Sequence, residues 1–130
     1  MQSVFIKTDS HYKVNRKKIR ETIEIFLREK KVSGKVEVSL NVVGNRMMRA
    51  LNKKFRSLDK TTDVLSFPLF LDQGETAFIN PPDDILRLGD IVISYPEARE
   101  GAMEENKMVD DKIDELVIHG MEHLLGNHHD

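Results

Sequence analysis

The feature that most constrains the fold is the apolar periodicity of residues 109–125, close to the end of the chain. Apolar residues recur there at helical spacing and would share one broad arc of an α-helix. The arc comprises Ile113, Leu116, Val117, Gly120, Met121 and Leu124. A helix with such a face must bury it against another layer of structure. The sequence therefore predicts a layered fold with an amphipathic helix near its C-terminal end.

Stretches with strand-like and helix-like patterns alternate along the chain. Strands are predicted near residues 4–6 and at 36–40, 62–67 and 88–93, and helices at 16–30, 46–55, 96–104 and 109–125. The segment 69–87 is expected to be irregular because it contains Gly74 and Pro81-Pro82. This order predicts an α+β fold with a small, mixed, four-stranded sheet packed with helices. At 130 residues, of which 39% are hydrophobic, the chain is expected to form a single domain, residues 1–130.

Composition narrows the chemistry. The chain has no cysteine, which excludes disulfides and thiolate metal sites, so nitrogen and oxygen must hold any transition metal. The start of the chain lacks the apolar segment of a signal peptide, and no stretch reaches the length of a membrane span. A cytoplasmic location without membrane association is therefore expected.

Four of the five histidines lie in the last dozen residues. His119 and His123 would lie one helical turn apart at the border of the apolar arc, and Gly126 is suited to end the helix before His129. Three imidazoles leave an open position for water, which is typical of a catalytic zinc. A packed or surface pair of histidines is the alternative, but three histidines at ligand spacing favour one divalent metal ion. Zinc is the ion we expect, and nickel, copper and iron also suit imidazole.

The histidine spacing matches H-E-x-x-H-x-x-G-x-x-H, the pattern of metzincin peptidases, at every histidine and at the glycine. Gly120, however, stands where those peptidases carry the general-base glutamate. Glu122 is no substitute, because on a helix it would be turned about 60° away from His119, on the far side from His123. The pattern predicts a zincin-like, metal-binding C-terminal helix without the peptidase base.

Charge is unevenly distributed. Residues 46–60 contain six basic residues and one acid, whereas residues 97–115 contain eight acids and three basic residues. On the predicted helix 46–55, a basic stripe formed by Arg46, Arg49 and Lys53, continued by Arg56, lies opposite Met47, Met48, Leu51 and Phe55. Ordinary solvated helix faces would look similar. Phe55, Phe67 and Phe70 are expected in the core rather than as surfaces on which bases stack.

Three blocks of the sequence resemble one family. His119-Gly120, His123-Leu124, Gly126 and His129 resemble the H-G-x-x-H-L-x-G-x-x-H signature of the YbeY family of bacterial rRNA-maturation endoribonucleases. Leu51-Asn52, Phe55-Arg56 and residues 62–68 (TDVLSFP) are similar to its L-N, [YF]-R and T-D-V-L-S-F-P block, and residues 88–93 (LGDIVI) to its L-G-D-I-x-I strand. The resemblance runs from about Leu40 to the C-terminus. Glu122 and Asn127-His128 depart from the usual Leu and Tyr-Asp, and the family spacing selects His129 over the adjacent His128 as the third ligand.

The resemblance implies a metal-dependent endoribonuclease, selective for single strands, in 16S rRNA 3′-end maturation, ribosome biogenesis and ribosome quality control. It implies an rRNA precursor, the small ribosomal subunit and its assembly factors as partners. His119, His123 and His129 would hold a metal whose bound water attacks the phosphodiester. Arg56, which matches the family's functional arginine, would contact the scissile phosphate, so Arg56 and His119 are the expected catalytic residues. Arg46, Arg49, Lys53 and Arg56 would bind the RNA.

Two other functions remain as alternatives. The first is a zinc metallopeptidase-like hydrolase, against which Gly120 argues. The second is a non-catalytic, zinc-containing module that binds the ribosome. Asp63, Ser66 and Asp90 either orient the cleft or serve as caps and strand-end hydrogen-bonding groups.

Overall fold

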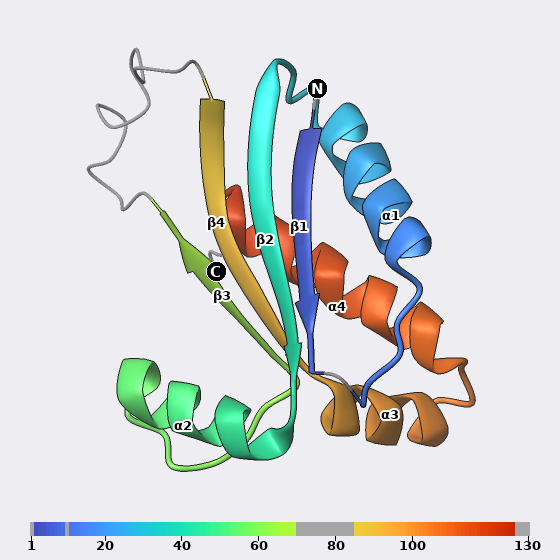
Figure 1. Cartoon of the computed structure of the whole chain (residues 1–130), viewed down its shortest axis with the longest axis vertical. Coiled ribbons are helices and arrows are strands. Elements are labelled where there is room, and N and C mark those ends of the chain that lie inside the picture. The colour runs from blue at the N-terminus through green and yellow to red at the C-terminus, as the bar shows by residue number, and fades with distance from the viewer. Residues whose placement is uncertain (1, 10, 70–84, 127–130) are drawn as a thin grey trace.

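The fold consists of a four-stranded mixed sheet with helices packed around it (Figure 1). The computed structural model describes residues 2–9, 11–69 and 85–126. The strands are β1 (Gln2–Thr8), β2 (Lys35–Val43), β3 (Val64–Pro68) and β4 (Ile85–Ser94). The helices are α1 (Arg16–Glu29), α2 (Asn45–Arg56), α3 (Tyr95–Glu104) and α4 (Val109–Leu124). The predicted α+β fold with a mixed sheet is thereby confirmed.

The strand order is β1-β2-β4-β3, in which β1, β2 and β4 run parallel and β3 pairs antiparallel with β4 at the edge. The helix from β1 to β2 provides the crossover that parallel neighbours require. All predicted elements form within a few residues of their expected bounds. The main exception is the start of β4, because Ile85, Leu86 and Arg87 pair with β2. The expectation of an irregular segment 69–87 is therefore wrong for these three residues, and 70–84 lies outside the described part.

Local signals explain where two helices begin. The Asn15 side chain accepts a hydrogen bond from the Lys18 backbone N–H at 3.0 Å, which caps α1 as its sequence predicts. Ser94 caps α3 in the same way, accepting from the Glu97 N–H at 3.3 Å, with Pro96 in the first turn. None of the helices among the described residues is long and apolar enough to cross a membrane.

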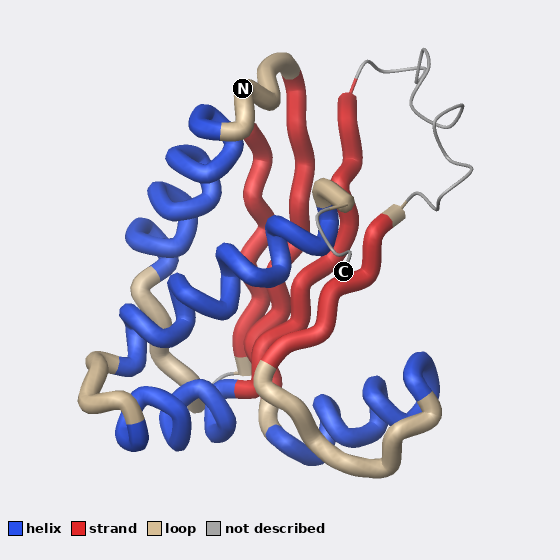
Figure 2. The backbone as a smooth tube through the Cα atoms, turned by 180° about the vertical axis from the view of Figure 1, so that it is seen from behind, coloured by secondary structure: helices blue, strands red, loops and turns tan. Residues whose placement is uncertain are grey.

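The main core lies between the sheet and the two helices α1 and α4, which cross the same face (Figure 2). β2 alternates as predicted, so that Val36, Val38, Leu40 and Val42 are buried. From the helices, the predicted apolar arc of α4 is buried, together with Ile19, Ile23, Phe26 and Leu27 of α1. This packing fixes α4 against β3 and β4.

A glycine in β4 sets the close pairing of β3 and β4. Gly89 has φ +136°, which L side chains rarely adopt, and it lies where the register between β2 and β4 shifts. A Cβ at this position would lie 2.2 Å from the Phe67 carbonyl oxygen and 3.1 Å from Leu124 Cδ2. Gly89 is thus required both by its backbone angle and by the closeness of β3.

Gly89→Ala is expected to lower the free energy of unfolding by roughly 2 kcal/mol or more, because strain and overlap act together. Chemical denaturation of the two proteins measures this difference. Gly34→Ala is the matched control, since Gly34 has φ +89° but a Cβ there meets no described atom within 4 Å. Equal losses in the two variants would show that the overlap with Phe67 and Leu124 contributes nothing.

Candidate active site

Two of the predicted metal ligands lie in one cleft with the predicted catalytic arginine. His119 and His123 are exposed on consecutive turns of α4. They line a cavity of about 400 Å³ together with Phe55 and Arg56 from the last turn of α2. Gly120 and residues 64–67 of β3 complete the lining. Folding thus brings the histidine helix and Arg56 together, as the resemblance implies.

The position of the histidines follows from how α4 packs. Gly120 is buried on the sheet side of the helix, and a Cβ there would lie 2.9 Å from two side-chain carbons of Ile91. Ile91 is itself fully buried in β4, so it has little room to move. The absence of a side chain at Gly120 lets α4 approach the sheet closely. The position that carries the base in metzincins is therefore occupied by a packing glycine.

The end of α4 agrees with the prediction as far as the structure describes it. The helix ends at Leu124, and Gly126 has φ +87°, with its N–H donating to the His123 carbonyl at 3.0 Å. His128 and the predicted third ligand His129 lie outside the described residues. Within the described part of the chain, no group of three or more His, Cys, Asp or Glu could hold a metal ion. The third ligand therefore stays a prediction.

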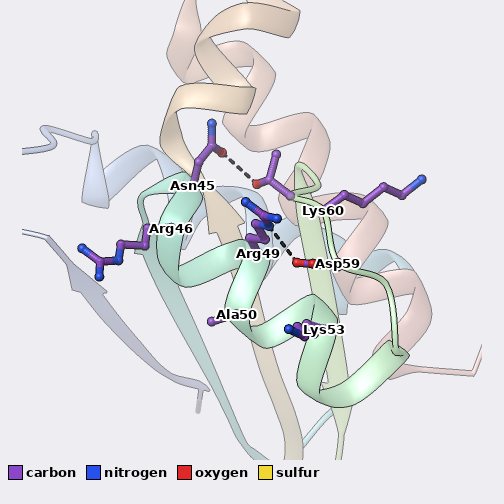
Figure 3. Close-up of a pocket in the computed structure, with 8 residues that line it drawn as sticks. Asn45, Arg46, Arg49, Ala50, Lys53, Asp59 and Lys60 are labelled. Atoms are coloured by element: carbon purple, nitrogen blue, oxygen red, sulfur yellow. Dashed lines mark hydrogen bonds and ion pairs between the residues drawn. The ribbon is translucent and has the colours of Figure 1, made fainter.

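The basic stripe of α2 divides between two sites. Arg46, Arg49 and Lys53 line a separate cavity of about 660 Å³, whereas Arg56 lines the histidine cleft. Arg46 and Lys60 extend to opposite sides of this basic cavity, so the cations form a strip and do not converge on one point (Figure 3).

One cation of the strip is already paired. Arg49 Nε donates to Asp59 Oδ1 at 2.8 Å, and both side chains are well exposed. This hydrogen bond, together with the attraction between the two opposite charges, raises the pKa of Arg49. It also holds the pKa of the Asp59 carboxyl below its ordinary value. Among the described residues, no acidic side chain pairs with Arg56. Arg56 is thus the stripe member available to an anion inside the histidine cleft.

Polar side chains hold the segment after α2 against the helix. Asn52 is buried and donates from Nδ2 to the Lys60 carbonyl at 2.9 Å. Asn45 Oδ1 accepts from Thr61 Oγ1 at 2.9 Å and from Ser94 Oγ at 2.6 Å. Ser57, with φ +60°, ends the helix directly after Arg56. These bonds bring Lys60, the last of the six basic residues of segment 46–60, into the basic cavity.

The remaining predicted residues lie as follows. Ser66 lines the histidine cleft, and the Asp63 carbonyl accepts from the Ser94 N–H at 2.9 Å. Asp90 is exposed on the opposite face of the sheet from α4 and lines a different groove. The expectation that Phe55 belongs to the core is wrong, because 55% of it is exposed. Phe67 is half-buried, and Phe70 lies outside the described residues.

A family model and curated relatives match most of this chain. The family model "Endoribonuclease YbeY" matches residues 5–130. The Endoribonuclease YbeY of Thermoanaerobacter sp. (strain X514) is 40% identical over 116 residues, which are 86% of this chain and 73% of the relative. That of Caldicellulosiruptor saccharolyticus is 38% identical over 123 residues, covering 93% of this chain and 75% of the relative.

A solved structure is also similar. The solution structure of TM1509 from Thermotoga maritima superposes with a TM-score of 0.61 at 27% sequence identity, covering 98% of this chain and 75% of the other. The family model and the curated relatives thus lead to the same conclusion. The chain belongs to the YbeY family of endoribonucleases.

Proposed function

We propose that this chain is a metal-dependent endoribonuclease, selective for single strands, that matures the 3′ end of 16S rRNA in the cytoplasm. The observation that carries the proposal is the meeting of His119, His123 and Arg56 in one cleft of a YbeY-family protein. We further propose that residues 1–130 act as one hydrolase domain. Its partners in ribosome biogenesis and quality control would be the rRNA precursor, the small subunit and its assembly factors.

The donors available in the cleft fit a divalent ion. His119 and His123 are exposed toward the same cavity, and neutral imidazole nitrogen suits zinc in a chain that has no cysteine. His129 is the proposed third ligand, which would make α4 a zincin-like metal helix. When bound, zinc would supply a Lewis acid for the phosphoryl oxygen and lower the pKa of a water molecule.

Arg56 would bind and orient the scissile phosphate. Its guanidinium presents parallel N–H donors that match two phosphate oxygens, and its positive charge offsets negative charge that develops in the transition state. Because Arg56 has no ion-pair partner among the described residues, these N–H donors are available to a phosphate. Arg56 lies on the last turn of α2 and lines the same cleft as the histidines.

Arg46, Arg49 and Lys53 would follow the RNA backbone beyond the cleft. They lie on the same helix as Arg56, and their spread along the basic cavity suits successive phosphates better than one anion (Figure 3). Arg49 would contribute less than its neighbours, because Asp59 already compensates its charge.

Removal of the metal tests the proposal. We expect the purified protein to cleave a single-stranded RNA, to lose this activity in excess chelator, and to regain it when zinc is added back. A duplex of the same sequence should remain intact. Gel analysis of end-labelled RNA measures cleavage under each of these conditions. Cleavage of precursor 16S rRNA in small subunits tests whether the protein matures the 3′ end. Cleavage that continues unchanged in chelator would contradict a metal-dependent mechanism.

A further inference from the structure

An open groove lies on the face of the sheet that α1 and α4 do not cross. Strand register places Phe5, Ser39, Asp90 and Phe67 in one row across all four strands. Of the described helices, α2 lines this groove, whose volume is about 820 Å³. Figure 2, which views the molecule from behind, shows α1 and α4 in front of the sheet, and both views (Figures 1 and 2) show α2 at one end of it.

Phe55 and Phe67 connect the groove to the histidine cleft, because both residues line both cavities. Their ring centroids are 5.1 Å apart, and the planes meet edge to face at 64°. Phe67 packs against the small core of Met48, Leu65 and Val92, so it forms a firm support. Phe55 packs against Phe67, while more than half of the surface of Phe55 stays exposed.

The surroundings of Phe55 are cationic. Lys54 Nζ lies 5.2 Å from the centroid of the Phe55 ring, and Arg56 follows directly in the chain. Lys7, Ser39, Asn41 and Asp90 supply hydrogen-bonding groups along the groove. An aromatic ring between two cations matches the alternation of base and phosphate in a nucleic acid strand.

We propose that Phe55, supported by Phe67, binds the nucleobase next to the phosphodiester that Arg56 holds. The proposal rests on the proposed function, because the ligand is the single-stranded RNA substrate. Phe55 and Arg56 are consecutive residues, so one turn of α2 would contact a base and its phosphate together. Stacking on Phe55 requires an unpaired base, which gives the cleft a physical basis for rejecting duplex RNA.

Binding is measured with short single-stranded RNAs that carry 2-aminopurine at nucleotides on either side of the cleavage site, in chelator so that the RNA stays intact. Wild-type protein is expected to quench the probe at one of these nucleotides. Phe55→Ala and Phe55→Leu should each weaken binding about tenfold, whereas Phe55→Tyr, which keeps a ring, should bind within about twofold of wild type. An abasic nucleotide at the quenched position should weaken wild-type binding equally and cause no further loss in Phe55→Ala.

Met47→Ala is the matched control. Met47 lies two turns earlier on α2, is 53% exposed and lines the groove without lining the histidine cleft. Met47→Ala should bind RNA as wild type does. All variants should have the melting temperature of wild type, because the side chains of Phe55 and Met47 are both exposed. Under cleavage conditions, Phe55→Ala should raise KM about tenfold with little change in kcat.

The outcomes separate this inference from the proposed function. Unchanged binding in Phe55→Ala, or an equal loss in Met47→Ala, would overturn the stacking site even if the wild type cleaves RNA. The second result would instead indicate a general apolar surface such as a protein partner requires. Ring-dependent quenching by a protein that never cleaves RNA would support the stacking site and contradict the nuclease.

Discussion

His123→Ala is expected to lose bound metal and RNA cleavage together, with activity falling by at least about a hundredfold. The reason is that His119 alone would remain on α4 to hold the ion. Metal analysis of the purified variant and an RNA cleavage assay measure the two losses in parallel. The variant should stay folded, because His123 is exposed and makes no part of the core.

His11→Ala is the matched control for this experiment. His11 is also exposed, but its ring lies tilted at 53° against that of Tyr12, with centroids 4.6 Å apart, and it does not line the histidine cleft. This variant should keep both metal and activity. Cleavage by metal-free His123→Ala at the wild-type rate would show that the metal is not catalytic.

Arg56→Ala is expected to keep the metal and to reduce kcat by about 10² to 10³, the loss typical of removing one donor to transition-state charge. Arg56→Lys should recover part of this loss, because a lysine keeps the charge but not the planar fork. Single-turnover cleavage at saturating RNA measures the chemical step separately from binding. A wild-type rate in Arg56→Ala would remove this residue from the mechanism.

Lys53→Ala offers the sharpest comparison with Arg56→Ala, since both residues are exposed on the same helix three positions apart. Lys53 lines the basic cavity and not the cleft. Its loss should raise KM and reduce the salt dependence of binding while leaving kcat unchanged. A fall in kcat as large as that of Arg56→Ala would show that the two cavities act as one site.

Much of this fold could be read from periodicity. The elements with clear patterns and caps, such as α1 after Asn15 and the alternating β2, form where they are predicted. The sequence predicts an irregular conformation for Ile85–Arg87 because turn-forming residues precede it, whereas pairing with β2 decides its conformation. A local sequence pattern indicates whether a segment favours a helix, a strand or a loop, but it does not show which strand the segment pairs with.

The candidate site could be predicted only in part, because local pattern does not show which residues tertiary packing covers or pairs. Histidine spacing predicts His119 and His123 as ligands, the family resemblance implies a role for Arg56, and the structure brings these three residues into one cleft. Helical periodicity placed Phe55 with Met48 on the apolar side of α2, but only a tertiary structure shows which residues on that side are covered. Helical periodicity also puts Arg56 and Arg49 on the same stripe of α2. Periodicity does not show that Asp59 forms an ion pair with Arg49 and not with Arg56.

The contact between Gly120 and Ile91 also limits how this scaffold can change its chemistry over evolutionary time. A single substitution that installs a carboxylate at position 120 would force a side chain into Ile91, 2.9 Å from where its first carbon must lie. Space would have to be created in β4 before the new group brought any benefit. Peptidase-like chemistry on this helix therefore lies at least two coordinated substitutions away, and the first of them would leave a cavity in the core.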